Sequence, residues 1–389
     1  IRSTGYIDAL AGDDVILACS EDTSYINRQT VNAGSGNNSV NVVSDYSIIT
    51  GGTGDDTYKI SSTVSTLVDE GGNNTIYIDR NSGSNNWYYD ITLNGNGNNS
   101  VISRTDDIMY PVYKITATGS GKQIIDVDSA ESISVTEYHE SPDENVSHDF
   151  STEITTGSGD DEISVTSGTV NSGAGADIIT VKNNGKATKA TLKGGEGNDS
   201  YIIASGQDNG NGTSVNSVAL IDDSQGSNEV VFTNELMTHD NLNLLLNVKS
   251  DGSLAEFTHK ESGEDGELVD AGNGFSAFIT TDYGLTAMGS VANASNNGWN
   301  YYDDYCKAVR LADTDTVNNL SKIEASDGYY ISSETLSTVI AQAASWLTSD
   351  GREYGSIMDA IRPEGSFNED NYNALYAIFN NENTWTQGA

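Results

Sequence analysis

Hydrophobic and polar positions alternate along residues 8–233, and each stretch of alternation follows a glycine-rich turn. In each unit a glycine is followed two residues later by Asp, Asn or Gln, and four residues later by a bulky apolar or aromatic residue. The glycines are Gly12, Gly36, Gly54, Gly72, Gly97, Gly121, Gly159, Gly175, Gly197 and Gly226. The apolar residues are Ile16, Val40, Tyr58, Ile76, Val101, Ile125, Ile163, Ile179, Tyr201 and Val230. Two residues further on the chain is again apolar, except at Ser103. This pattern predicts a short strand after each turn, with alternate side chains directed inward.

A single unit of this kind cannot bury its own apolar face, but stacked units can, because equivalent strands then pair and their inward residues form one narrow core. The glycines are mostly separated by the length of a coil made of two short strands and two turns. Irregular separations indicate loops inserted on the coils, the longest around residues 138–150. The sequence therefore predicts a β-solenoid over residues 1–233.

Two units, residues 51–59 and 194–202, match the nonapeptide G-G-x-G-x-D-x-U-x completely, and residues 156–164 and 172–180 differ only at the first glycine. Over residues 8–233 the chain resembles the RTX, or haemolysin-type calcium-binding, repeat family. The resemblance implies an all-β fold, a parallel β-roll or β-solenoid with calcium between the turns of adjacent coils. The alternative is a series of surface turns on an ordinary β-sandwich.

The same resemblance implies that Ca²⁺ is held by sixth-position aspartates and by carbonyl groups of the turn glycines, which are oxygen ligands of the kind that calcium favours. The main candidates are Asp161, Asp177 and Asp199 with Gly157, Gly159, Gly173, Gly175, Gly195 and Gly197. Further candidates are Asp14, and Asp56 with Gly52 and Gly54. Where the chain has Asn38, Asn74, Asn99 or Asn228 instead, the coils are expected to stack through amide hydrogen bonds without metal.

The net charge of the chain favours cations as its binding partners. The chain has 18 Lys and Arg against 57 Asp and Glu among 389 residues, a formal net charge of −39, which repels nucleic acid and anionic membrane surfaces. Self-repulsion of this size destabilises a compact state, and a divalent ion among the carboxylates offsets it. The alternative is a solvated acidic surface. Only 36% of residues are hydrophobic, which favours a slender core.

Beyond residue 233 the pattern changes. Leu242, Leu244, Leu245, Leu246 and Val248 begin a β-rich capping region over residues 234–330, and residues 331–389 form a helical region. One helix is predicted from Ser332 or Ser333 to about Asp350, and two more around residues 354–361 and 372–379. The segment 327–330 before the first helix resembles the C-terminal region of proteins exported by type I secretion. That resemblance implies a secreted, extracellular protein whose folding is coupled to calcium.

No enzymatic motif is visible. His139, His148, His239 and His259 occur singly, and Cys19 and Cys306 are expected to be isolated thiols. No nucleophile motif or phosphate-binding loop is present, so the chain is expected not to be an enzyme. No apolar run is long enough to predict a transmembrane segment.

The sequence thus favours a secreted, calcium-binding structural or adhesive protein of the cell surface, such as an S-layer subunit. Its expected partners are calcium ions, further copies of itself, and cell-surface glycan or lipopolysaccharide. The alternative is the C-terminal calcium-binding and secretion module of a larger RTX toxin, protease or lipase. A ligand-binding or ice-binding solenoid would need outward threonines in register, and the outward positions are mixed.

Overall fold

The computed structural model describes residues 2–3, 5–19, 28–79, 87–103, 111–130, 132–137, 146–182, 188–204, 217–235, 237–256, 260–262, 268–270, 276–281, 308–349, 354–361, 363, 368–381 and 383–388. The chain divides into two units. Unit 1 comprises residues 1–180 with 193–197, and unit 2 comprises residues 181–192 with 198–389.

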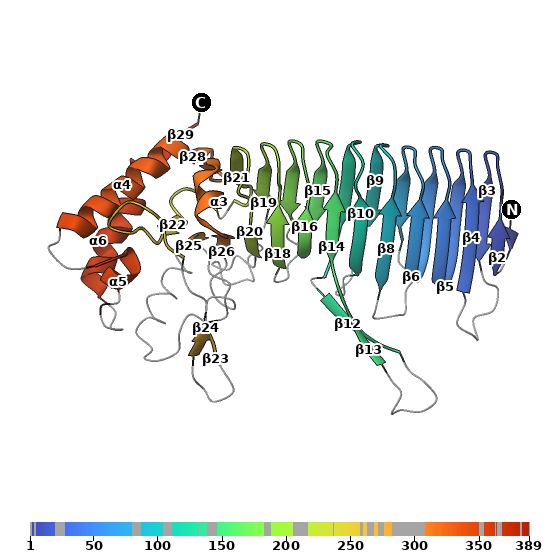
Figure 1. Cartoon of the computed structure of the whole chain (residues 1–389), viewed down its shortest axis with the longest axis horizontal. Coiled ribbons are helices and arrows are strands. Elements are labelled where there is room, and N and C mark those ends of the chain that lie inside the picture. The colour runs from blue at the N-terminus through green and yellow to red at the C-terminus, as the bar shows by residue number, and fades with distance from the viewer. Residues whose placement is uncertain are drawn as a thin grey trace. The chain divides into compact units, whose positions relative to one another are not determined.

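Unit 1 consists of coils that each place one strand in each of two parallel ladders. Ladder A contains β1 (Arg2–Ser3), β3 (Val15–Cys19), the first parts of β5 (Ser39–Gly51) and β6 (Thr57–Asp69), β7 (Thr75–Ile78), β9 (Asn99–Ser103), β11 (Gln123–Val127), β15 (Glu162–Val165) and β17 (Ile178–Val181). Ladder B contains β2 (Tyr6–Asp8), β4 (Arg28–Gly34), the second parts of β5 and β6, β8 (Tyr88–Leu93), β10 (Val112–Ala117), β14 (Glu153–Thr156) and β16 (Gly168–Asn171). Figure 1 shows these strands side by side. The unit is all-β and solenoid-like.

The core of unit 1 lies between the two ladders. The apolar residues that follow the glycines in its sequence, from Ile16 to Ile179, are all buried, which confirms the predicted inward register. Ladder B contributes Ile49, Leu67, Tyr89 and Ile115 from the other side. Ser103, the polar exception in the pattern, is also buried, and its Oγ lies 2.7 Å from the hydroxyl of Tyr113. A tyrosine from ladder B thus fills the space that an aliphatic side chain occupies in other coils.

The two edges of unit 1 differ. The glycine-rich turns lead from ladder B to ladder A and form one edge without long insertions (Figure 1). Longer connections leave from the opposite edge, and one of them carries the antiparallel hairpin β12 (Ser132–Glu137) and β13 (Val146–Ser151). The ring of Phe150 stacks on Tyr88 of ladder B, with 4.2 Å between the ring centroids.

Unit 2 begins with the same kind of coil and then changes to antiparallel pairing. One set runs from β18 (Thr188–Lys193) through β20 (Ser217–Ile221) and β26 (Ala308–Leu311), in parallel, to β25 (Ala277–Thr281) and β22 (Leu242–Leu246), which are antiparallel. The other runs from β19 (Ser200–Ile203) through β21 (Asn228–Phe232) and β27 (Leu320–Glu324) to β28 (Tyr329–Ser332) and β29 (Thr386–Gln387), with the same change. A separate hairpin pairs β23 (Lys260–Ser262) with β24 (Leu268–Asp270).

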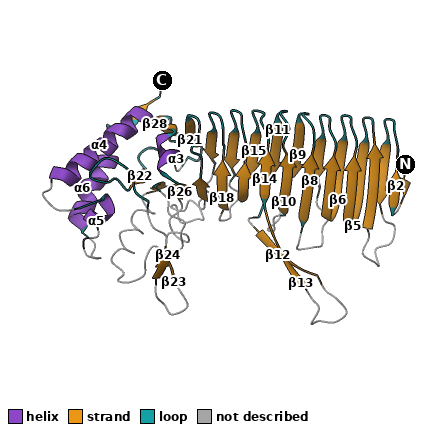
Figure 2. Ribbon diagram, viewed as in Figure 1, coloured by secondary structure: helices purple, strands orange, loops and turns teal. Residues whose placement is uncertain are grey.

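The helices of the described residues all belong to unit 2 (Figure 2): α3 (Thr314–Asn318), α4 (Ser333–Ser349), α5 (Ile357–Ile361) and α6 (Glu369–Phe379). The three predicted C-terminal helices are confirmed as α4, α5 and α6. At the start of α4 the Ser332 hydroxyl accepts a hydrogen bond from the Thr335 amide at 3.2 Å. Leu336, Val339, Ala343 and Leu347 form its buried stripe. Within the described residues no helix is both long enough and apolar enough to cross a bilayer. The three-part division at residues 233 and 330 stays a prediction.

Candidate metal centre

The residues that follow the turn glycines by two positions form a buried row along the glycine-rich edge of unit 1. We call them the inner row: Asp14, Asn38, Asp56, Asn74, Asn99, Gln123, Asp161 and Asp177. From Asn38 to Asp177 each of these polar side chains is buried. Buried polar groups need partners, so the contacts of this row decide what the edge can bind.

Most inner-row side chains accept a hydrogen bond from the backbone of the preceding coil; Gln123 Oε1 instead accepts from Asn99 Nδ2 at 2.9 Å. The Asp14 amide donates to Asn38 Oδ1 at 3.1 Å, and the Asn38 amide donates to Asp56 Oδ1 at 2.6 Å. The series continues with Asp56 to Asn74 at 2.9 Å, Asn74 to Asn99 at 3.0 Å, Gln123 to Asp161 at 2.7 Å and Asp161 to Asp177 at 2.8 Å. From Asn38 to Asp177, one oxygen of each inner-row side chain is therefore used to join two coils.

An exposed outer row lies one residue earlier in each turn. Here the backbone amide of each coil donates to the side chain of the preceding coil, which is the reverse of the inner row. The Asn37 amide donates to Asp13 Oδ1, and the Asp55 amide donates to Asn37 Oδ1, both at 2.8 Å. The Asn73, Asn98 and Lys122 amides continue this pattern. Adjacent turns are thus joined by two hydrogen bonds of opposite direction, which fixes their register.

The glycines place backbone carbonyls in the gap between turns. A Cβ atom on Gly175, where φ is +137°, would lie 2.3 Å from the Gly159 carbonyl oxygen, and one on Gly159 would lie 2.5 Å from that of Gly121. The same contact recurs for Gly52, Gly54, Gly157, Gly173, Gly195 and Gly197, each against a turn carbonyl of the preceding coil. All the glycines predicted as ligands therefore lie at the interfaces between turns, where only a residue without Cβ fits.

In coils with an amide in the inner row, the NH₂ group of the side chain donates a hydrogen bond to a turn carbonyl. Asn38 Nδ2 donates to the Gly36 carbonyl at 2.9 Å, Asn99 Nδ2 donates to the Gly97 carbonyl at 3.2 Å, and Gln123 Nε2 donates to the Gly121 carbonyl at 2.6 Å. The amide oxygen accepts and the NH₂ group donates, so the turn is satisfied by neutral groups.

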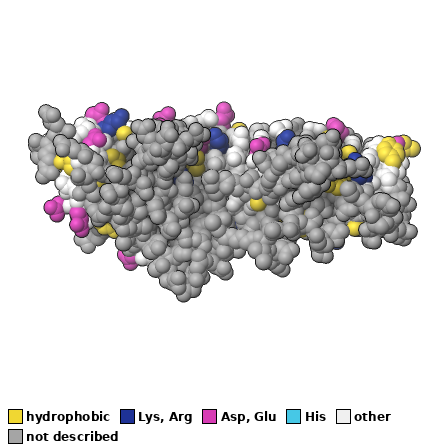
Figure 3. Space-filling model, turned by 90° about the horizontal axis from the view of Figure 1, so that it is seen from below, with side chains coloured by type: hydrophobic (Ala, Val, Ile, Leu, Met, Phe, Trp, Pro, Cys, Tyr) yellow, Lys and Arg dark blue, Asp and Glu magenta, His cyan; other side chains and the backbone are white. Residues whose placement is uncertain are grey.

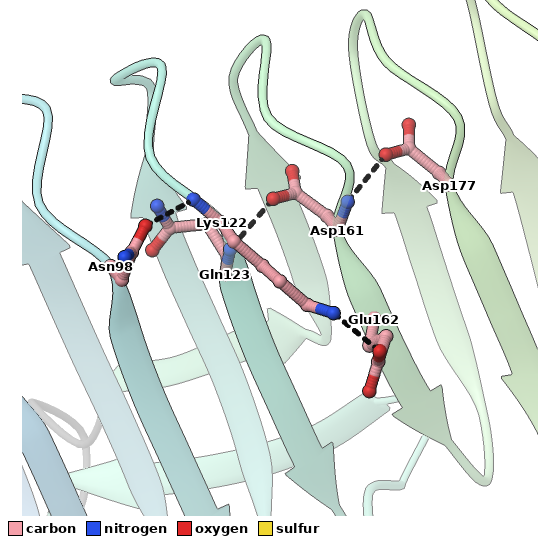
Figure 4. Close-up of polar contacts among 6 residues, drawn as sticks. All are labelled: Asn98, Lys122, Gln123, Asp161, Glu162 and Asp177. Atoms are coloured by element: carbon pink, nitrogen blue, oxygen red, sulfur yellow. Dashed lines mark hydrogen bonds and ion pairs between the residues drawn. The ribbon is translucent and has the colours of Figure 1, made fainter.

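Asp161 and Asp177 differ, because a carboxylate has no proton to donate to the turn carbonyls. Each presents Oδ1 to the backbone of the preceding coil (Figure 4). Asp161 Oδ2 is buried and accepts no hydrogen bond within the described part of the chain. The hydroxyl of Thr156, which lies near this carboxylate, donates its one proton to the Ser172 carbonyl at 2.8 Å. Lys122 is engaged with Glu162 on the surface.

Burial is the main influence on these carboxyl groups. It raises the pKa of Asp161, against the opposing hydrogen bond from the Gln123 amide. It raises the pKa of Asp177 from its usual 3.8 to about 6. A buried carboxylate with an open oxygen is stabilised by either a proton or a cation.

Asp56 has a different environment from Asp161. Its Oδ1 accepts from the Asn38 amide, and its Oδ2 lies 3.1 Å from the Tyr58 hydroxyl. Tyr58 is also 2.5 Å from Oδ2 of Asp69, whose Oδ1 accepts from the Gly71 amide and from Asn74 Nδ2. Burial raises the pKa of Asp69 to about 6. Asp56 Oδ1 is thus engaged by a backbone amide, and its Oδ2 shares the single proton of the Tyr58 hydroxyl with Asp69.

Unit 2 has a similar tyrosine–aspartate pair beside its own inner-row residues, Asp199 and Asn228. Asp199 is buried, and its amide donates to Asn228 Oδ1 at 2.9 Å. Tyr201 donates to Asp223 Oδ2 at 2.5 Å, and Asn228 Nδ2 donates to the same oxygen at 2.8 Å. The pairs Tyr58–Asp69 and Tyr201–Asp223 were missed from the sequence. The available signal was that both complete nonapeptides carry Tyr in place of the usual Ile or Val, and that Asp stands just before the next turn.

Within the described residues, the remaining predicted chemistry gives no competing site. Asp14 is half-buried, and its buried Oδ2 accepts no hydrogen bond from the described residues. His239 stacks on Tyr329, and its Nδ1 lies 2.6 Å from Asp327 Oδ2 in unit 2. His139, His259, Cys306 and the side chain of His148 lie outside the described residues. Where side chains are described, no three of His, Cys, Asp and Glu converge on a metal position. A cation at the turns therefore needs backbone carbonyl ligands in addition to carboxylates.

Comparisons with protein-family models, with curated proteins and with solved structures give no match to this chain.

Proposed function

We propose that this chain is an extracellular calcium-binding structural or adhesive protein of the cell surface, whose carboxylate coils form a parallel β-roll of the RTX type with calcium between their turns. Asp161 and Asp177, with the carbonyls of Gly157, Gly159, Gly173 and Gly175, would hold the ions in unit 1. Asp199 would contribute in unit 2. The absence of an enzymatic motif and the net charge of −39 favour a structural role over catalysis.

The observation that carries the proposal is the open oxygen of Asp161. In the coil before it, the NH₂ group of Gln123 bonds the turn carbonyl, whereas in the Asp161 coil a carboxylate faces the turn and brings no proton. A hard cation accepts donation from both the carboxylate and the carbonyls, and so replaces the missing amide protons. The donor set consists of oxygen atoms alone, which fits calcium better than a softer metal.

Calcium would act as part of the fold. Its binding stabilises the native state by about 2.7 kcal/mol per site when free calcium is about 100-fold above the dissociation constant. In a compartment with little calcium, the paired aspartates repel one another and the carboxylate coils are destabilised. This coupling supports export of an unfolded chain followed by folding outside the cell, where calcium is plentiful.

The direct test is calcium binding by the full chain, measured by isothermal titration calorimetry and metal analysis after dialysis, with circular dichroism in calcium and in chelator. The expected result is bound calcium and a large gain of β-structure signal. The double variant Asp161→Asn/Asp177→Asn should bind less calcium, whereas Asp160→Asn, an exposed neighbour in the outer row, should bind as the wild type does. A chain without bound calcium, or with the same spectrum in both buffers, contradicts the proposal.

A further inference from the structure

The outward face of ladder B in the first coils of unit 1 carries a partly apolar strip that contains no carboxylate. Its residues come from alternate positions of β4, β5 and β6, and we call them the B strip: Arg28, Thr30, Asn32, Tyr46, Ile48, Thr50, Val64, Thr66 and Val68. No carboxylate occurs among these outward positions, although the chain has 57 Asp and Glu. Asp8 of β2 and Asp90 of β8 bound the strip along the ladder.

Large hydrophobic side chains are exposed in this region. Ile48 is 56% exposed and Tyr46 is 40% exposed, and Tyr6, in register with Thr30 beside Ile48, is 64% exposed. Hydrophobic side chains are also visible at the end of unit 1 that carries the first coil (yellow at the right in Figure 3). On the outward face of ladder A the exposed apolar residues are instead separated, because β5 and β6 lie between Val15 and Tyr77. Exposed apolar side chains gathered on one face of an otherwise polar chain mark a binding surface.

We infer that the B strip is a self-association face, at which two copies of this chain pack sheet against sheet around a two-fold axis. The charge of the molecule supports this occupant. Two chains of net charge −39 repel each other at most orientations, and a face without carboxylates allows close approach. The inference rests on the proposed role as an assembling surface protein, and it names the surface and the partner.

Charge complementarity fixes the orientation. Arg28 lies at the start of β4, and Asn32, at the other end of β4, donates from Nδ2 to Asp8 Oδ1 at 3.1 Å. The two-fold axis runs along the direction in which the strands of ladder B stack, so β4 of one copy lies antiparallel over β4 of the other. Arg28 of each copy then meets the Asn32–Asp8 pair of the other. The same operation places Ile48 against its own counterpart and Tyr46 against Thr50. The dimer gains two equivalent Arg28–Asp8 ion pairs around an apolar centre.

The interface lies away from the proposed calcium ligands. The strands of ladder B in this region lead into turns that contain Asn38, Asp56 and Asn74, which are not among the proposed calcium ligands. Dimerisation and calcium binding can therefore be measured as separate properties of the same protein.

The test is the molar mass of the full chain in calcium, measured by size-exclusion chromatography with light scattering over a range of concentrations. The wild type should reach twice the monomer mass. Ile48→Glu should raise the dimer dissociation constant at least about 100-fold, because it buries a charge at the centre of the interface. Ile124→Glu is the matched control, since Ile124 is 41% exposed on ladder A beside Glu162, and it should dimerise as the wild type does.

A mixing experiment tests the orientation. Arg28→Glu and Asp8→Arg should each be monomeric alone, because each homodimer would contain two like-charge contacts. An equimolar mixture should restore the dimer, because one ion pair is then re-formed with reversed sign and the other is the native Arg28–Asp8 pair. If Ile48→Glu fails to fold by circular dichroism, this mixture decides the question.

A monomeric wild type that still binds calcium overturns the interface and leaves the proposed function intact. A dimer that binds no calcium supports the interface and contradicts the proposed function. A dimer that survives Ile48→Glu, or a mixture that stays monomeric, also overturns the inference. Retention of a monomeric wild type on a neutral polysaccharide column, lost in Ile48→Glu, would assign the B strip to glycan instead.

Discussion

Two regions of unit 1 share one turn geometry but satisfy it with different chemistry. The coils around Asn38, Asn74, Asn99 and Gln123 have amide side chains in the inner row, and their NH₂ groups reach backbone carbonyls or Asp69. The coils at Asp161 and Asp177 have the same backbone hydrogen bond but a carboxylate with no proton for the turn. If the carboxylate coils bind calcium as proposed, a neutral amide and a carboxylate with a bound cation are equivalent solutions for the same turn, and only the second depends on the solvent.

Removal of calcium is the strongest test of this comparison. In chelator, backbone amides of residues 157–177 should exchange hydrogen at least about 100-fold faster, since each lost ion removes about 2.7 kcal/mol at saturating calcium. Amides of residues 38–79 and 111–127 should keep most of their protection. Hydrogen exchange with mass spectrometry resolves the two regions. Equal loss of protection in both would mean that the coils unfold as one unit or that calcium binds elsewhere.

Asn74→Asp should convert an amide coil into a charged one. The change removes the Nδ2 donor to Asp69 Oδ1 and places a second carboxylate beside a buried one. We expect the free energy of unfolding to fall by about 2–4 kcal/mol in chelator, as measured by urea denaturation. Asn73→Asp makes the same chemical change at the adjacent exposed position and should cost less than about 0.5 kcal/mol. Equal costs would argue against the importance of burial.

The pH dependence of stability in chelator should show the buried carboxyls. The pKa of Asp177 is raised to about 6 by burial, as is that of Asp69. Between about pH 4 and about pH 6 the native chain therefore binds more protons than the unfolded chain. The free energy of unfolding should fall as pH rises through that window, by on the order of 1–3 kcal/mol for each group.

With calcium present, the slope for the Asp161 and Asp177 coils should reverse, because protons and calcium compete for the same oxygens. The slope that arises from Asp69 should remain. Local stability from hydrogen exchange at several pH values separates the two contributions. A reversal in both regions would place calcium at Asp69 and Asp56 as well.

The smallest expected effect comes from Asp161→Asn and Asp177→Asn, which convert the carboxylate coils into amide coils. In chelator each change should stabilise the chain by about 1 kcal/mol, because a neutral NH₂ group can then bond the turn carbonyl. Thermal unfolding in chelator provides the measurement, and Asp160→Asn is the exposed control. Loss of stability in both variants would mean that these carboxylates make native contacts that an amide cannot replace.

The sequence predicts the strands of ladder A well, because glycine, the inner-row residue and the inward apolar residue recur at fixed separations from Ile16 to Ile179. Ladder B is harder to predict, since connections of variable length, such as the one with β12 and β13, separate its strands from that pattern. The longest predicted helix, α4, carries a periodic apolar stripe and a serine cap, which are local signals.

The candidate centre could be predicted only in part. Spacing identifies Asp161, Asp177 and Asp56 as equivalent, but their environments differ through long-range partners. Tyr58 reaches across the core to Asp69, which stands on ladder B. That pairing depends on which strands face each other, and this is a property of the fold that a repeat does not encode. The hydrogen bond from the Lys122 amide to Asn98 Oδ1 in the outer row likewise forms only once the coils are stacked.

The opposed hydrogen bonds of the inner and outer rows make the coil the natural unit of change in this protein. A deletion of one residue within a turn would shift both rows at once and expose the inward side chains. Excision of residues 56–73 would instead join Asp55 directly to Asn74, at the same point of the next coil, since the inner-row residues here are 18 positions apart. Lengthening or shortening of such a chain by whole coils therefore preserves the architecture, and this gives evolution a simple way to adjust its reach.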